Sequence, residues 1–231
     1  MGYLSIRPHQ KKALRAIASI STDKFTGISS NLINQAKPSI RASGLLDAVR
    51  ELSNDEDFST ALCAQLISLA TFRRVEKMET VGVFDLLFEG IKQAEFSEDE
   101  TCWFDTTRDS FVDLLDSECV ALPAKALYLS TDFDQLYASA NVVTDVRPVF
   151  DGDRASVAGA LVAQTLQIRF VGGNGSAEEQ QVSLALDLDD IEKLIAELEK
   201  AKQKAQCAKE RFGADTGAEI FIIGEETYGF S

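Results

Sequence analysis

Histidine is almost absent from this chain of 231 residues, since His9 is the single one. Ser–His and Cys–His nucleophile pairs both need an imidazole, so any such site would have to use His9. That residue lies near the start of the chain, where backbone order is usually poor, and we predict that it is exposed to solvent rather than catalytic. The chain also has no Cys-x-x-Cys motif, so the spacing of a Cys/His zinc site is missing.

The few cysteines are widely spaced: Cys63, Cys102, Cys119 and Cys207. This spacing predicts free thiols in a reducing compartment. No run of the sequence approaches the roughly 20 apolar residues of a membrane-spanning helix. Residues 1–8 lack the charged-then-apolar order of a secretion signal. We therefore expect a cytoplasmic protein without membrane insertion.

Positive charge is scarce as well. The 23 Lys and Arg residues face 37 Asp and Glu residues, which gives a net charge of −14. Nucleic-acid phosphates and anionic membrane surfaces repel such a protein. The densest basic run, Lys11, Lys12 and Arg15, is short, and we interpret it as a solvated helix face. We predict no nucleic-acid partner.

Two motifs resemble ligand loops without completing them. Asp151-Gly152-Asp153 is similar to the start of a metal-binding loop but lacks the further ligands of an EF-hand. Gly172–Gly175 lacks the following helix and the Lys-Ser/Thr pair of a phosphate loop, so a hairpin is predicted there. We expect no metal, cofactor or enzymatic activity, and a hydrolase that uses carboxylates alone is the least favoured class.

Residues from about 10 to 138 show helical periodicity, with apolar side chains three and four positions apart. Ser97, followed by Glu100, has the spacing of a capping box at a helix start. Short links between these segments predict a compact bundle of roughly five to seven helices. The expected helices cover residues 9–20, 23–36, 43–52, 57–72, 81–94 and 105–115.

Near residue 140 the period changes from helical to alternating. Residues 141–150, 161–171 and 180–187 predict three half-buried antiparallel strands. A long helix follows from Leu188 or Asp189, with Asp187 as its N-cap and Gly213 as its stop. The fold class is therefore α+β. The apolar seam of this last helix consists of Ile191, Leu194, Leu198, Ala201, Ala205, Ala208 and Phe212.

A three-stranded sheet with one helix has little interior, yet these strands carry apolar residues on both faces. Burying a few hundred Å² at about 25 cal/mol per Å² is worth several kcal/mol. The helical half of the chain or a second copy could supply the cover. The helix seam could likewise pack on its own sheet or on another chain. The apolar tail Ile220–Ile223 could dock on its own domain or add a strand to a neighbour.

The order of three strands and a long helix after a helical domain resembles the COMM-domain proteins. Residues 144–150, 161–171 and 182–201 carry the resemblance. The family places a tryptophan three residues before an aspartate in its first strand; here Asp145 fits and Val142 replaces the tryptophan, as in a distant or bacterial relative. The resemblance implies a helical domain over 1–135, a dimerisation domain over 136–213 and a tail over 214–231.

The resemblance also implies assembly without catalysis. Partners would be a second copy or a paralogous COMM-like subunit, in a dimer or a higher ring, together with an unidentified protein partner. We thus expect a non-enzymatic scaffold subunit, with an acidic stoichiometric regulator of a basic protein as the alternative. The implied dimer interface consists of Val142, Val146, Val149, Phe150, Val162, Leu166, Ile168, Phe170, Ile191, Leu194 and Leu198.

Overall fold

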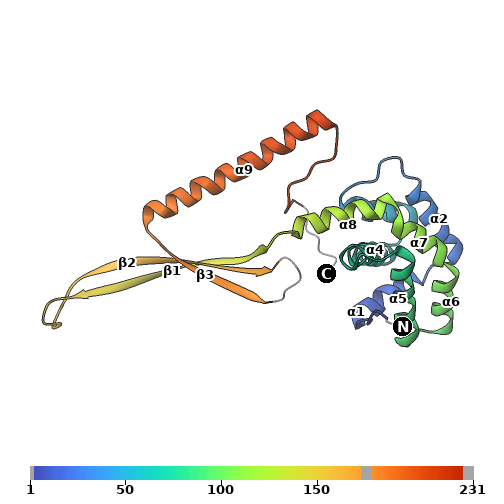
Figure 1. The fold of residues 1–231 in the computed structure, drawn as a ribbon, viewed down its shortest axis with the longest axis horizontal. Helices are drawn as coiled ribbons and strands as arrows, with labels where there is room; N and C mark the ends of the chain where they lie inside the picture. The colour runs from blue at the N-terminus through green and yellow to red at the C-terminus, as the bar shows by residue number, and fades with distance from the viewer. Residues whose placement is uncertain (1–2, 173–177, 226–231) are drawn as a thin grey trace. The chain divides into compact units, whose positions relative to one another are not determined.

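The computed structural model describes residues 3–172 and 178–225 (Figure 1). The chain divides into two compact parts, which we call the helical unit and the β-α unit. The helical unit comprises the described residues up to Leu129 together with Gly224 and Glu225, and the β-α unit runs from Ser130 to Ile223. Helices followed by a three-stranded antiparallel sheet and a long helix confirm the predicted α+β class.

The helical unit contains eight helices within its described residues, one more than the highest number expected. The additional helix is α8, which carries Pro123 in its interior. Proline removes a backbone donor and normally ends a helical pattern, so the sequence signal is weak there. The helices are α1 (Pro8–Ile17), α2 (Thr22–Ile33), α3 (Ala42–Ser53), α4 (Glu56–Glu76), α5 (Thr80–Gln93), α6 (Glu98–Thr106), α7 (Arg108–Asp116) and α8 (Glu118–Thr131).

Side-chain caps begin several of these helices. The predicted capping box at α6 is confirmed: Glu100 N donates to Ser97 Oγ at 3.1 Å, and Ser97 N donates to the Glu100 carboxylate at 2.7 Å. At α4, Asp55 accepts a hydrogen bond from Phe58 N at 3.0 Å. Each cap satisfies backbone donors that a helix leaves unpaired at its start, which positions α4 and α6 in the bundle.

Aromatic side chains form the centre of the helical core. The Phe25 ring lies 5.1 Å from Trp103 and 5.8 Å from Phe111, and Phe84 lies 5.5 Å from Phe111 between ring centroids. The Trp103 indole also donates to the Ile20 carbonyl at 2.7 Å. Phe25, Phe84 and Phe111 are fully buried, so the helical unit has a core that needs no second chain.

The sheet of the β-α unit has the order β1-β2-β3, with β1 (Gln135–Phe150) and β2 (Val157–Gly172) much longer than β3 (Glu179–Leu186). Both long strands begin earlier than predicted, by six and four residues. Their first residues, QLYASA and VAGA, carry little β-propensity, but the partner strand supplies the hydrogen bonds. The glycine-rich hairpin predicted at 172–175 lies outside the described residues, apart from Gly172 at the end of β2.

The last helix, α9 (Leu188–Thr216), begins as predicted at Asp187, which forms a capping box with Asp190. The predicted stop at Gly213 is wrong. Gly217 ends the helix instead, because it adopts a left-handed φ of 63° and its N–H donates to the Gly213 carbonyl at 2.9 Å. Within the described residues, no helix combines the length and the apolar character that crossing a membrane requires.

Candidate interaction surface

The β-α unit has no interior of its own. Among its described residues, not one side chain is buried, whereas the helical unit buries a full set of apolar side chains. Domains of ordinary stability depend on burying most of their apolar surface. The exposed apolar side chains of the β-α unit therefore form the candidate functional site of this protein.

Strand register sorts the sheet into one apolar and one polar face. Residues paired across antiparallel strands share a face. Val142 pairs with Leu166, and Leu166 with Leu184. The next rung in one direction on this face is Ala140–Ile168–Val182, and in the other direction the partly polar rung Thr144–Gln164–Leu186 precedes Val146–Val162. We call this surface the apolar face, and it remains open: Val146 is 68% exposed and Val162 is 66% exposed.

The opposite face of the sheet is mainly polar over the same rungs. Asn141 pairs with Gln167 and Gln167 with Ser183, while Ser139 pairs with Arg169 and Arg169 with Gln181. Such a face is stable in water, whereas the apolar face is not. The expectation of two apolar faces thus holds for only part of the sheet, chiefly at Leu161, which lies on the polar side and is exposed.

The structure brings together most of the residues predicted at the interface. Val142, Val146, Val162, Leu166, Ile168 and Phe170 all lie on the apolar face. Val149 pairs with Gly159 and lies on the opposite face, and Phe150 pairs with Val157 beyond a register shift. Val182 and Leu184 are absent from the predicted interface. Only the pairing of β2 with β3 shows that they extend the same surface.

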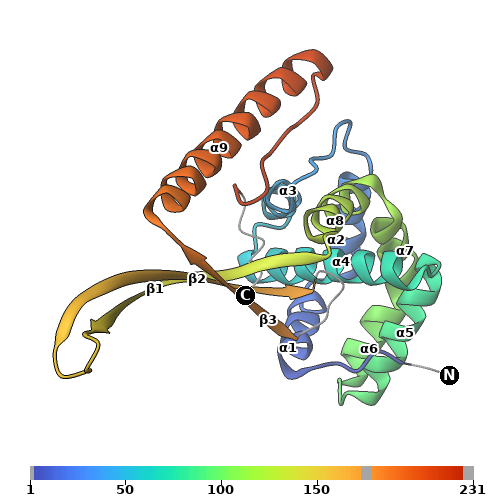
Figure 2. The same cartoon turned by 60° about the vertical axis from the view of Figure 1, so that its left-hand side comes forward.

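The apolar seam of α9 is also uncovered. Ile191 is half-buried, but Leu194, Ile195 and Leu198 are exposed, and Leu198 reaches 59%. Figures 1 and 2 show α9 leaving the end of β3 and diverging from the sheet rather than lying across it. Packing of the seam along its own sheet, one of the two possibilities raised by the sequence, is not what the structure shows. The seam remains available to another chain.

The apolar tail occupies the far end of α9. Ile220, Phe221 and Ile222 line a cavity of about 530 Å³ together with Ala205, Ala208 and Phe212. Gly213 lies against Ile220, whose Cγ1 would be 3.7 Å from a β-carbon added at that glycine. The tail therefore lies beside the end of α9 within the β-α unit. Ala208 stays exposed beside the tail and Phe212 is 59% exposed, so the seam is open at this end as well as at Ile191–Leu198.

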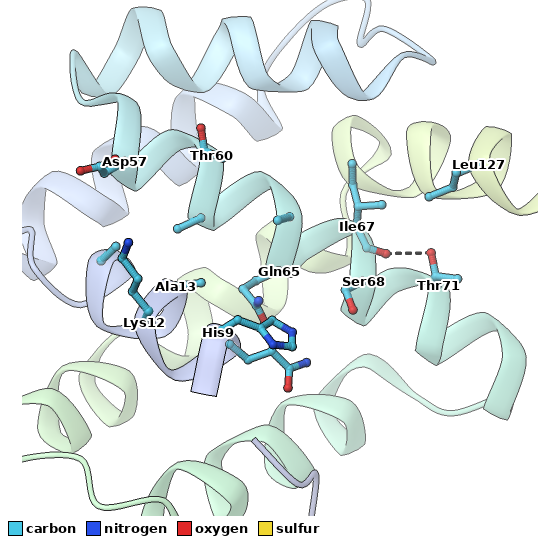
Figure 3. Close-up of a pocket in the computed structure, with 14 residues that line it drawn as sticks. His9, Lys12, Ala13, Asp57, Thr60, Gln65, Ile67, Ser68, Thr71 and Leu127 are labelled. Atoms are coloured by element: carbon cyan, nitrogen blue, oxygen red, sulfur yellow. Dashed lines mark hydrogen bonds between the residues drawn. The ribbon is translucent and has the colours of Figure 1, made fainter. Parts of the chain in front are cut away.

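The residues considered for catalysis or metal binding, His9 and Asp151, lie outside the apolar face. His9 is exposed on α1 (Figure 3). Asp151 accepts hydrogen bonds from Ala155 N at 2.9 Å and Ser156 N at 3.1 Å, and the Ser156 hydroxyl is the main cause of its lowered pKa. Asp151 thus stabilises the β1–β2 turn. No group of three or more potential ligands gathers at one point within residues 3–172 and 178–225.

The four thiols are unpaired, and their exposure predicts their reactivity. Burial raises the pKa of Cys63 to about 12 and also raises the pKa of Cys119, whereas Cys102 and Cys207 are exposed. Iodoacetamide at about pH 8, where thiolates react, should modify Cys102 and Cys207 rapidly. Cys63 and Cys119 should react only after denaturation. Peptide mass spectrometry would show this order, and rapid labelling of Cys63 in the folded protein would contradict it.

Comparison with known proteins adds no family assignment, because no protein-family model matches the chain and no curated protein matches its sequence.

Proposed function

We propose that this chain is a non-enzymatic, cytoplasmic protein-interaction subunit that dimerises through its β-α unit and presents its helical unit to a partner protein. One observation carries the proposal: the described part of the β-α unit exposes an apolar sheet face and an apolar helix seam, yet buries no side chain. A second copy offers both surfaces at once, so each can be covered by its counterpart. The four free thiols support a reducing compartment.

A two-fold symmetric dimer can cover both of these surfaces, whereas a contact through one surface leaves the other exposed. The apolar face spans rungs from Ala140 to Val146, and the open seam of α9 spans Ile191 to Leu198. Stable dimers bury roughly 1,200–2,000 Å² in total, an area that one sheet face and one helix from each chain can supply. The resemblance to COMM domains supports the same arrangement, in which two copies of a β-β-β-α unit intertwine.

Native mass tests the proposal directly. Sedimentation of the full chain at micromolar concentration should give twice the 25.2 kDa of one chain, and dilution should not separate the copies above nanomolar concentration. The apolar character of the contact predicts little change with salt. A monomer that binds a basic protein in a salt-sensitive manner would overturn the proposal and favour the acidic regulator.

A further inference from the structure

The apolar seam of α9 changes in side-chain size halfway along the helix. Bulky residues occupy its first half and alanines its second half: Ile191, Leu194 and Leu198, then Ala201, Ala205 and Ala208. The steps of three and four residues are the heptad pattern of a helix that packs along another helix. Alanines let two helix axes approach to about 8 Å, whereas leucines need space opposite them. The seam therefore fits a helix with the reverse order of side-chain sizes.

The charges of α9 follow the same division. Residues 189–200 carry five acidic and two basic side chains, a net charge of −3, whereas residues 201–212 carry four basic and one acidic side chain, a net charge of +3. A parallel copy of this helix would place like charges side by side, and an antiparallel copy places opposite charges side by side. The helix that fits the seam thus has the order of α9 itself, running in the opposite direction.

One antiparallel register matches the side-chain sizes along the whole seam. It is centred between positions 198 and 201 of the two copies. Every bulky seam residue then faces an alanine of the other copy: Leu198 with Ala201, Leu194 with Ala205, and Ile191 with Ala208. A parallel pair would place leucine against leucine and alanine against alanine, which leaves voids at the alanine layers.

The positions beside the seam carry opposite charges in the same register. Asp190 and Glu197 each precede a bulky seam residue, and Lys204 and Arg211 hold the equivalent heptad positions in the second half. Such flanking positions determine partner choice and orientation in paired helices. The register brings Glu197 beside Lys204 of the second copy, and Asp190 beside Arg211. Within one chain Glu197 pairs with Lys200 at 2.6 Å, but exposed pairs of this kind are weak and exchange readily.

A cavity at the basic end of α9 has room for the bulky end of another copy. It measures about 530 Å³, and its lining includes Ala205 and Ala208 on the helix and Phe221 on the tail. Ala208 is exposed to solvent there. The register brings Ile191 and Leu194 of the second copy to this apolar lining, so the cavity matches the side chains that it would receive.

We propose that α9 pairs antiparallel with α9 of a second copy, with Leu198 opposite Ala201. The inference rests on the proposed function, because it names the partner and the register of one of the two surfaces in the dimer. The paired seam from Ile191 to Ala208 spans about five helical turns. The apolar sheet face supplies the rest of the contact.

Charge reversal at Glu197 and Lys204 tests the register in the full-length protein. Glu197→Lys places like charges side by side at two symmetric points of the dimer, so the dissociation constant from sedimentation should rise about tenfold. Lys204→Glu should weaken the dimer to a similar extent. Both substitutions in one chain should restore the dissociation constant to within about threefold. The matched control is Glu199→Lys, which makes the same charge change away from the seam and should have little effect.

Lys204→Glu also distinguishes the two possible helix directions. A parallel pair would bring Lys204 beside Lys209 of the other copy, so this substitution would then tighten the dimer. An exchange of side-chain size gives an independent measurement. Leu198→Ala and Ala201→Leu should each weaken the dimer, and the two together should restore it, because the register places these positions opposite each other.

The proposal is overturned if the double charge reversal stays as weak as the single substitutions, if Lys204→Glu tightens the dimer, or if Glu199→Lys weakens it as much as Glu197→Lys. A dimer whose dissociation constant responds to none of these substitutions rejects helix pairing and leaves the contact through the apolar face standing. A chain that is monomeric at micromolar concentration before any substitution rejects the proposed function as well, so the two failures are distinguishable.

Discussion

Arginine in place of Leu166 is expected to convert the proposed dimer into a monomer and to unfold the β-α unit. Leu166 lies at the centre of the apolar face, between Val142 on β1 and Leu184 on β3. An unpaired guanidinium there would be buried against a second copy at a cost of about 4 kcal/mol, or roughly a thousandfold in the dissociation constant. Sedimentation well below micromolar concentration, where the unsubstituted chain is still expected to pair, should show the loss of half the mass. Limited proteolysis should show rapid cleavage after about residue 130, with the helical unit intact.

Gln167→Arg provides the matched control for this experiment. It introduces the same side chain one residue along β2, on the polar face between Asn141 and Ser183. The proposed dimer should persist with its dissociation constant changed by less than about tenfold, since Gln167 lies on the polar face, outside the proposed contact. Equal effects of the two substitutions would show that the apolar face does not form the contact.

Phe111→Ala is expected to destabilise the helical unit severely. Phe111 is fully buried, and its ring contacts those of Phe25 and Phe84. Removing a core phenylalanine costs about 3–5 kcal/mol, against a typical domain stability of about 5–15 kcal/mol. The melting temperature should fall by roughly 10–20 °C. Urea titration followed by fluorescence of Trp103, the one tryptophan of the chain, reports on this unit directly.

Phe133→Ala is the control for the core truncation, because Phe133 is 53% exposed and lies in the β-α unit. The Trp103 transition should then shift by less than about 1 kcal/mol. Phe111→Leu, which retains most of the apolar volume, should have an intermediate effect. A Phe111→Ala protein with an unchanged Trp103 transition would contradict the assignment of this aromatic cluster as the core.

Local patterns in the sequence were sufficient to predict the fold class and most helices. The start of α6 followed from Ser97 and Glu100, and the start of α9 followed from Asp187, because a cap depends on residues three positions apart. The end of α9 was placed wrongly at Gly213. Two glycines follow the seam within five residues, and composition does not show which of them takes a left-handed φ.

The candidate surface was predictable only within each strand. Alternation placed Val162, Leu166 and Phe170 on one face of β2, but strand pairing decides which residues of β1 and β3 join them. The predicted interface includes Val149, which lies on the opposite face from Val142 and Val146, and omits Val182 and Leu184, which extend the apolar face.

The absence of buried side chains in the described part of the β-α unit has a consequence for the steady-state concentration of this protein in a cell. In the proposed dimer, ordering of the C-terminal strands depends on two copies meeting, so the fraction of intact molecules rises with concentration. A newly made copy without a partner subunit exposes apolar strands and unpaired sheet edges, which proteases and chaperones recognise. Unpaired copies are then degraded. In the proposed dimer, the cellular level of the chain thus depends on the concentration of partner subunits as well as on its rate of synthesis.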